Sequence, residues 1–174
     1  MKLDEAKKQF VETWGTLGTN WGINRTMAQI HALMLVTEEP LNTEQVMDKL
    51  GISRGNANMN LRALVEWRLI EGRTVLGQRV EHFVAEKDIW KVVTRILTER
   101  RKRELDPLKT YLGNLHDIED RHKKPAEHKA FVKMITDIEN FVDTADKITN
   151  KLTDSNKGWF FNTLMKFILG KTKP

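Results

Sequence analysis

Residues 50–83 constrain the fold more than any other stretch, because they combine a helix stop, a polar helix and a hairpin signal. Gly51 ends a short helical pattern, and Ser53 is placed to cap the helix that follows. Beyond that helix, predicted over residues 53–67, two β-prone runs flank a turn at Gly77 and predict a hairpin. Helix, tight turn, helix and hairpin together indicate a winged helix-turn-helix.

The predicted helix over residues 53–67 has two unlike faces. The face expected to pack inward carries apolar residues and one arginine at helical spacing: Ala57, Leu61, Leu64, Val65 and Arg68. The other carries asparagine and arginine where an ordinary exposed helix uses glutamate, lysine and glutamine: Arg54, Asn56, Asn58, Asn60 and Arg62. Because arginine and asparagine pair bidentately with guanine and adenine in the major groove, this face predicts sequence-specific binding of double-stranded DNA.

Eight residues are therefore candidates for contact with DNA. Six belong to the predicted helix and its cap: Ser53, Arg54, Asn56, Asn58, Asn60 and Arg62. Arg73 and Arg79 lie in the hairpin, where they are placed to meet phosphate or the minor groove. Spacing alone leaves one alternative open, a small αβ module whose polar face is merely solvated.

Composition bounds the remaining possibilities. With 174 residues, a net charge of +5 and a pI near 9.4, the chain is long enough for a core and moderately favours a polyanionic partner. It has no cysteine, which excludes disulfides, thiolate metal sites and cysteine nucleophiles. The N-terminus has no apolar signal core and no apolar run reaches membrane-spanning length, so we expect a cytoplasmic protein.

Further helices are expected on both sides of this stretch. The first carries an apolar stripe and is interrupted by the glycines of residues 18–22: Leu3, Ala6, Phe10, Trp14 and Leu17. Asn24 is placed to cap the second, and Asn42 with Gln45 resembles a capping box that opens the third. From Asp88 onward the pattern is long, charged helix, which Asp106-Pro107 should break or kink and Lys124-Pro125 should punctuate again.

The long helices have little surface of their own to cover their apolar stripes, and a second copy would cover them. We therefore expect a mainly α fold with a small β wing, acting as a homodimer. Residues 1–86 form a winged helix-turn-helix domain, whose first helix could join the dimer interface, and residues 87–153 form a helical dimerisation region. Residues 154–174 are an apolar aromatic tail, too short to span a membrane, which we expect to dock into the dimer rather than to anchor in lipid.

A family resemblance is carried by residues 50–56 (Leu-Gly-Ile-Ser-Arg-Gly-Asn), by Met-Asn-Leu-Arg at residues 59–62, and by Leu64 and Trp67. These residues resemble the GbsR-like branch of the MarR superfamily. The hairpin and the basic run of residues 100–107 are similar to that branch as well. The resemblance implies a dimeric winged-helix transcriptional regulator, usually a repressor, in a branch that includes regulators of choline and glycine-betaine genes. Gln78 and Glu81-His82 stand where relatives tend to carry lysine, which implies weaker phosphate contacts in the hairpin.

Several chemistries find little support in the sequence. The chain lacks a phosphate-binding loop, a dinucleotide motif, a nucleophile elbow and a zinc-protease signature, so we expect neither an enzyme nor a cofactor. One cluster has no defined ligand spacing and reads as a solvated helix end rather than a metal site: His116, Asp117, Glu119, Asp120 and His122. His31 fits a core or interface histidine, and the arginines of residues 100–103 fit surface ion pairs with Glu99 and Glu104 or a role at the dimer face.

The aromatic residues suggest one effector hypothesis. Aromatic faces bind quaternary ammonium groups, and Trp14, Trp21 and Trp90 could form such a cage, although buried tryptophans are more often core. The sequence as a whole predicts a homodimeric DNA-binding regulator of a pseudo-palindromic site, controlled by an effector between the winged domain and the long helices. The alternative is a winged-helix dimer that serves as a protein- or membrane-interaction scaffold through its tail.

Overall fold

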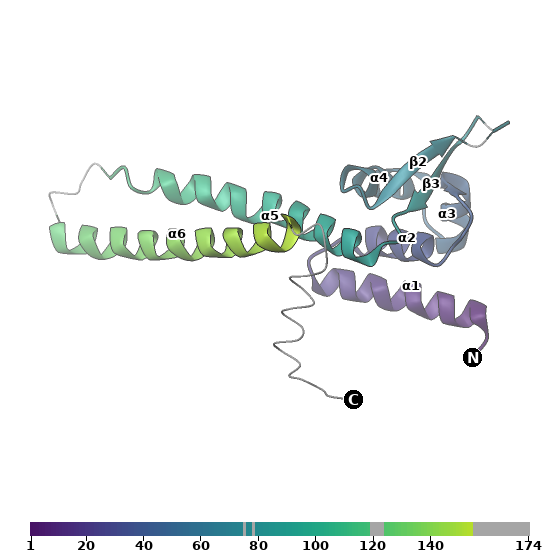
Figure 1. The fold of residues 1–174 in the computed structure, drawn as a ribbon, viewed down its shortest axis with the longest axis horizontal. Helices are drawn as coiled ribbons and strands as arrows, with labels where there is room; N and C mark the ends of the chain where they lie inside the picture. Colours follow the sequence, from purple (N-terminus) through teal and green to yellow (C-terminus); the bar gives the residue numbers. More distant parts are fainter. Residues whose placement is uncertain (75, 78, 119–123, 155–174) are drawn as a thin grey trace. The chain divides into compact units, whose positions relative to one another are not determined.

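The computed structural model describes residues 1–74, 76–77, 79–118 and 124–154, and its fold is mainly α with one small antiparallel sheet (Figure 1). The chain divides into two compact units, Met1–Val92 and Val93–Pro174, each taken by itself below. The helices and strands follow in chain order: α1 (Leu3–Asn20), α2 (Arg25–Leu35), β1 (Leu41–Asn42), α3 (Thr43–Leu50), α4 (Arg54–Glu66), β2 (Ile70–Thr74), β3 (Glu81–Ala85), α5 (Ile89–Asn114) and α6 (Pro125–Asp154).

Small residues bring α1 and α2 close together. Gly15 and Gly18 are buried in α1, and a Cβ placed on Gly18 would lie 2.5 Å from the Cβ of Ala28 in α2. The predicted interruption of the first helix within residues 18–22 is confirmed, because α1 ends at Asn20 and Gly22 follows with φ of +74°. Gly18 itself remains helical, and its lack of a side chain permits the close contact with α2. The expected apolar stripe is left partly outside this contact, with Leu3 69% and Leu17 38% exposed.

The predicted helix caps in this unit are confirmed. The side chains of Asn24 and Ser53 accept hydrogen bonds from the third residue of α2 and α4, and Asn42 and Gln45 form a reciprocal capping box on α3. Gly51 ends α3 in the left-handed region with φ of +64°, a conformation that favours glycine. These local interactions set the tight turn between α3 and α4.

The sheet has one strand more than the sequence predicted. β2 and β3 form the expected hairpin, with Ile70 opposite Ala85 and Thr74 opposite Glu81. The two-residue strand β1 pairs antiparallel with β3 through Leu41 and gives the strand order β1-β3-β2. Only pairing across the fold defines so short a strand, which has no periodicity of its own.

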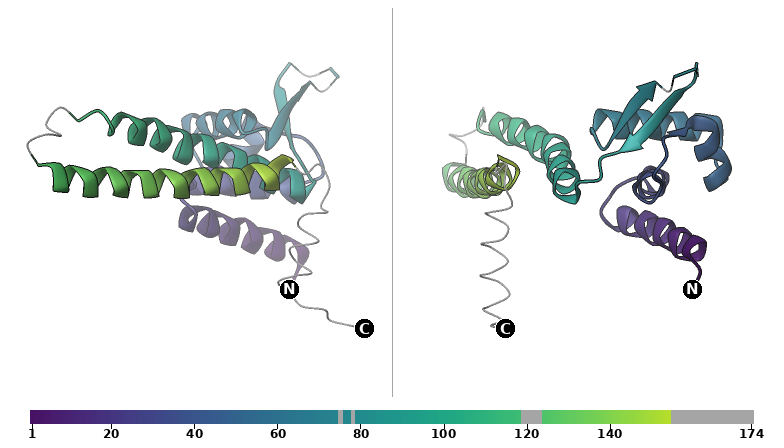
Figure 2. Two further views of the ribbon diagram at one scale, coloured as in Figure 1. Left: turned by 60° about the vertical axis from the view of Figure 1, so that its left-hand side comes forward. Right: turned by 45° about the vertical axis from the view of Figure 1, so that its right-hand side comes forward.

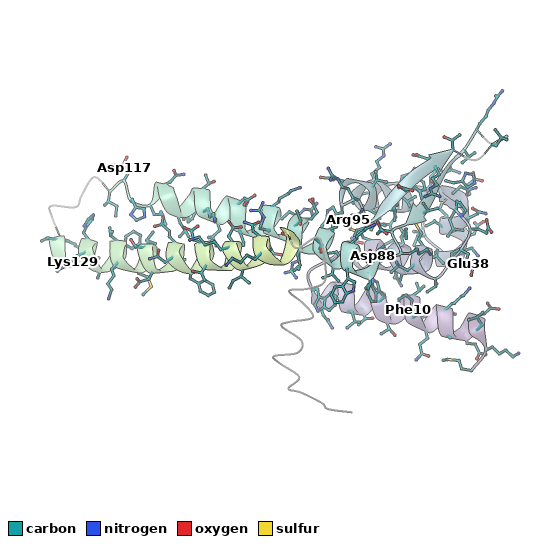
Figure 3. The ribbon with its side chains drawn as sticks, in the orientation of Figure 1. Phe10, Glu38, Asp88, Arg95, Asp117 and Lys129 are labelled. Carbon is teal, nitrogen blue, oxygen red and sulfur yellow. The ribbon has the colours of Figure 1, made fainter. Side chains whose placement is uncertain are left out.

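Lys87 ties the segment after the hairpin to the end of α2. Its ammonium donates hydrogen bonds of 2.7, 2.8 and 2.7 Å to the carbonyl oxygens of Met34, Leu35 and Thr37. The last carbonyls of a helix lack partners within the helix, so a lysine supplies the missing donors and a favourable charge. Desolvation lowers the pKa of this ammonium. Asp88, labelled in Figure 3, follows at once and caps α5 through the backbone NH of Trp90 at 2.9 Å.

In the second unit, α5 and α6 lie side by side as a helical hairpin in both views of Figure 2. The buried core of this hairpin is apolar: Leu112, Ile135 and Val142, with Leu105 and Leu115 packed against them. The predicted break at Pro107 was wrong, because α5 continues through it to Asn114. A proline removes one backbone hydrogen bond, here from residue 107 to residue 103, and the helix tolerates that loss.

Charged contacts also join the two helices of this hairpin. The carboxylate of Asp146 in α6 accepts from Arg101 at 3.0 Å and from Lys109 at 2.8 Å, both in α5. Just beyond the C-terminal end of α5, Nε2 of His116 lies 2.9 Å from Oε2 of Glu139 in α6. Hydrogen bonds from the two cations lower the pKa of the Asp146 carboxyl.

A second apolar stripe runs along α6, apart from the buried one. Its large side chains are exposed by 37–72% and recur at spacings of three, four and seven residues: Phe131, Met134, Ile138, Phe141 and Ile148. Half-buried Ala145 occupies the position between the last two. This alternation is the seven-residue repeat of helices that pack along one another.

Candidate nucleic-acid interface

Burial divides α4 into an inner and an outer face. The inner face is buried and includes one asparagine: Ala57, Asn60, Leu61 and Leu64. The outer face of α4, a name kept below, is exposed along the whole helix: Arg54, Gly55, Asn58, Met59, Arg62, Val65 and Glu66. The prediction that Arg68 and Val65 pack inward was wrong, since Arg68 lies past the helix end with φ of +58° and Val65 is 40% exposed.

Asn60 was also misplaced, because it is only 3% exposed and cannot stand on an open polar face. Its amide nitrogen donates to the backbone oxygen of Asn56 at 2.8 Å and to the side-chain oxygen of Asn56 at 2.7 Å. Burying an amide is costly unless it is hydrogen-bonded, so these bonds compensate for its place on the inner face. Asn60 thus holds the half-buried side chain of Asn56.

The N-terminal part of the outer face is connected to α3. The guanidinium of Arg54 lies 2.8 Å from the carboxylate of Glu44, and both side chains are well exposed. Asn58 accepts a hydrogen bond of 3.4 Å from the hydroxyl of Thr43. Glu44 was not predicted as part of the site. Its position in the first turn of α3, where a negative charge interacts favourably with the helix dipole, was the only signal in the sequence.

Arg62 and Met59 are the freest side chains near the middle of the outer face. Arg62 makes no hydrogen bond or ion pair with the described residues and is exposed to solvent. Met59 is 60% exposed, between polar neighbours. Met59 was not among the predicted contacts with DNA, because a lone methionine carries no strong hydrogen-bonding signal.

The hairpin positions its two arginines differently. Arg73 in β2 bonds through Nε to the carboxylate of Glu71 at 2.8 Å, so part of its charge is neutralised within the strand. Arg79 lies exposed next to the turn, in which Gly77 adopts φ of +81°, and it pairs with no described residue. His82, by contrast, is 5% exposed, and its Nδ1 lies 2.9 Å from the carbonyl of Val80.

The three tryptophans of the predicted cage differ in their surroundings. Trp14 packs against Phe10, with ring centroids 5.4 Å apart, and against His31 at 6.5 Å. Trp21 and Trp90 are about half exposed, at 52% and 48%. The arrangement therefore gives no support to a quaternary ammonium cage, and its effector role stays a prediction.

His31 is a core histidine, as its sequence pattern suggested. It is 3% exposed, and its Nε2 has no hydrogen-bond partner among the described residues. Desolvation, with a smaller contribution from the charge of Lys87, lowers its pKa from 6.5 to about 4. The imidazole is consequently neutral at physiological pH.

Other predicted features fall partly outside the described residues. Glu119, Asp120 and His122 of the acidic cluster lie outside them, as do residues 155–174 of the aromatic tail. The basic run forms the ion pairs that were expected, with Arg100 2.9 Å from Glu104 and Lys102 2.8 Å from Glu99. Within the described ranges no group of acidic or histidine side chains could hold a metal ion, and no helix there is long and apolar enough to cross a bilayer.

Comparison with known proteins gives a likeness of fold. No protein family matches the chain by sequence. No curated protein matches it either. Among the solved structures that match is one described as "Crystal Structure of a transcriptional regulator", with a TM-score of 0.50 and 21% sequence identity, over 80% of this chain and 95% of that one. At this identity the two chains share a fold.

Proposed function

We propose that the protein is a sequence-specific DNA-binding transcriptional regulator built on a winged helix-turn-helix. The observation that carries this proposal is the outer face of α4, where Arg54, Asn58 and Arg62 stand on a helix that is otherwise packed into the core. A structure described as a transcriptional regulator has the same fold, which supports a regulatory rather than an enzymatic role. In this assignment α4 enters the major groove and the β2–β3 hairpin is the wing.

The contacts divide the candidate residues by role. Arg62 is the strongest candidate for reading a base, because its guanidinium is exposed and unengaged within the described chain. Arg79 is the corresponding candidate for phosphate at the wing, while Arg73 would first have to leave Glu71. Ser53 and Asn60 act mainly by holding the helix start and Asn56, since their side chains are used for capping and internal hydrogen bonds.

We further propose that the regulator is a homodimer joined through α6. The exposed stripe of α6 has the repeat that a partner helix requires, and α5 already covers the neighbouring side with Ile135 and Val142 buried. A second copy presents the same stripe, so two α5–α6 hairpins would close a four-helix bundle with a twofold axis. Such a dimer binds a pseudo-palindromic site with half-sites about 34–36 Å apart.

The resemblance of residues 50–67 to the GbsR-like branch extends the proposal to repression and to control by a small-molecule effector. No contact in the described residues identifies that effector. The alternative function, an interaction scaffold using the tail, depends on residues 155–174 and has no supporting observation in the described part of the chain. DNA binding is therefore the function that we put to the test.

The test is binding of the full chain to labelled duplexes across a salt series. One duplex comes from upstream of the protein's own gene, others from selection out of a random library, and unrelated duplex serves as competitor. We expect competitor-resistant binding whose affinity falls steeply with salt, because cationic side chains displace counterions from phosphate. Failure of the selection to enrich any sequence would contradict the proposal.

A further inference from the structure

An apolar side chain interrupts the polar outer face of α4. Met59 is 60% exposed, one helical turn after Gly55 and one before Arg62. Isolated exposed apolar residues are common on protein surfaces, so exposure alone assigns nothing. Here, however, the methionine occupies the middle of the face that is proposed to lie in the major groove, with the hydrogen-bonding residues Asn58 and Arg62 nearby.

Gly55 adds a second observation on the same ridge. It lies in the first turn of α4 with an ordinary helical backbone, and a Cβ placed on it would meet nothing within 4 Å. Neither packing nor backbone geometry within the protein therefore requires glycine, although glycine weakens a helix relative to alanine. Its effect is to leave the first turn bare, so that a partner could approach the helix closely there.

The two residues are coupled by the geometry of the helix. Long side chains in an α-helix lean toward its N-terminus and cover the turn three or four residues earlier. The flexible thioether of Met59 is therefore expected to reach over the bare turn at Gly55, at the N-terminal half of α4. In helix-turn-helix proteins this half of the second helix is the part that meets base edges.

We propose that Met59 is a specificity-determining residue that contacts the 5-methyl group of a thymine in each half-site. This inference rests on the proposed function. The thymine methyl is the one apolar group on a base edge in the major groove, and a methionine offers no strong hydrogen-bond donor for the other groups there. Gly55 lets the helix approach closely enough for this contact, while Arg62 and Asn58 supply the polar contacts on either side.

The experiment tests this contact by removing the methyl group from the DNA. In a duplex obtained by selection, each thymine is replaced in turn by deoxyuridine, which lacks the 5-methyl group and pairs identically. Affinity is measured for the full-length wild type, Met59→Ala, Met59→Leu and Arg62→Ala. For the wild type we expect one thymine per half-site at which deoxyuridine weakens binding by about fourfold. This factor corresponds to the free energy of burying one methyl group.

Met59→Ala should reduce that ratio to near one, and Met59→Leu should preserve most of it. Arg62→Ala is the matched control, since it should weaken binding to both duplexes and leave the thymine-to-deoxyuridine ratio unchanged. A wild type insensitive to deoxyuridine at every position, or an unchanged ratio in Met59→Ala, would overturn the inference while specific binding stands. If no duplex is bound specifically, both the inference and the proposed function fail.

Discussion

Arg54, the first residue of α4, holds the carboxylate of Glu44 in the first turn of α3 at 2.8 Å. The pair connects the two helices of the proposed DNA-binding motif at their N-terminal ends. Both side chains are about two-thirds exposed, so water screens their attraction and the pair adds little to folding stability. Its larger effect is on binding, because Glu44 places a negative charge beside the arginine that would approach phosphate.

Replacing Glu44 by Gln should therefore strengthen DNA binding. The substitution releases Arg54 and removes a repulsive charge, and we expect affinity at low salt to rise by roughly fivefold, or about 1 kcal/mol. The slope of log affinity against log salt should steepen by about one, as expected for one additional phosphate contact. Unchanged or weaker binding of Glu44→Gln would show that the pair helps to present Arg54.

Arg62→Ala should weaken binding to the selected duplex by roughly 1–3 kcal/mol and relax the preference at one base pair of each half-site. Lys129→Ala is the charge-matched control, because Lys129 is an exposed cation of α6 (Figure 3) without a partner in the described chain. Competition with single-base variants of the duplex measures both effects. An equal loss on all sequences would make Arg62 a phosphate contact instead of a base reader.

Burial of His31 should make the protein less stable in mild acid. Its pKa of about 4 in the fold lies below the ordinary histidine value of 6.5, so the unfolded chain binds the proton more readily. The free energy of unfolding is therefore not reduced by His31 above pH 6.5. It falls as pH decreases toward 4, where it is lower by about 3 kcal/mol. Urea unfolding of the wild type and of His31→Leu, which cannot titrate there, measures the difference. Parallel pH profiles for the two proteins would be inconsistent with this account.

Phe141 tests the proposed dimer contact, since it is the most exposed member of the α6 stripe at 72%. Phe141→Asp would place a charge in the seam of each copy and should raise the dimer dissociation constant at least about 100-fold. Asn140→Asp adds the same charge at the adjacent exposed position and should leave the dimer intact. Sedimentation equilibrium of the two variants distinguishes these outcomes, and a Phe141→Asp protein that remains dimeric would place the interface elsewhere.

Asp146 should matter more to the α5–α6 hairpin than its neighbour Asp143. Asp146 accepts from both Arg101 and Lys109, whereas Asp143 contacts Lys109 alone, so Asp146→Asn should lower the melting temperature more than Asp143→Asn. Because the pKa of Asp146 is lowered in the fold, its contribution is present at neutral pH and is lost as pH falls below about 4. Equal melting temperatures of the two variants at pH 7 would assign the alignment of the helices to apolar packing.

Much of the local structure was predictable because it depends on neighbours in the chain. Capping by Asn24, Asn42 and Ser53 and the helix stop at Gly51 involve groups within a few residues of one another. The β2–β3 hairpin was predictable from the turn at Gly77 between two β-prone runs. The candidate residues of the site were predictable in the same way, since Arg54 and Arg62 follow from helical spacing. The contacts of Arg54 with Glu44 and of Lys87 with the end of α2 were not, because they join residues ten and about fifty positions apart.

The sequence by itself determined the order of the helices, the β2–β3 hairpin and the polar character of α4, through capping, periodicity and turn chemistry. The tertiary structure decided which face of each helix is covered. It buried Asn60 with the apolar residues, packed Gly18 of α1 against Ala28 of α2, and paired Leu41 with β3. Burial depends on what packs against a residue, and the identity and spacing of residues along one helix do not specify that partner.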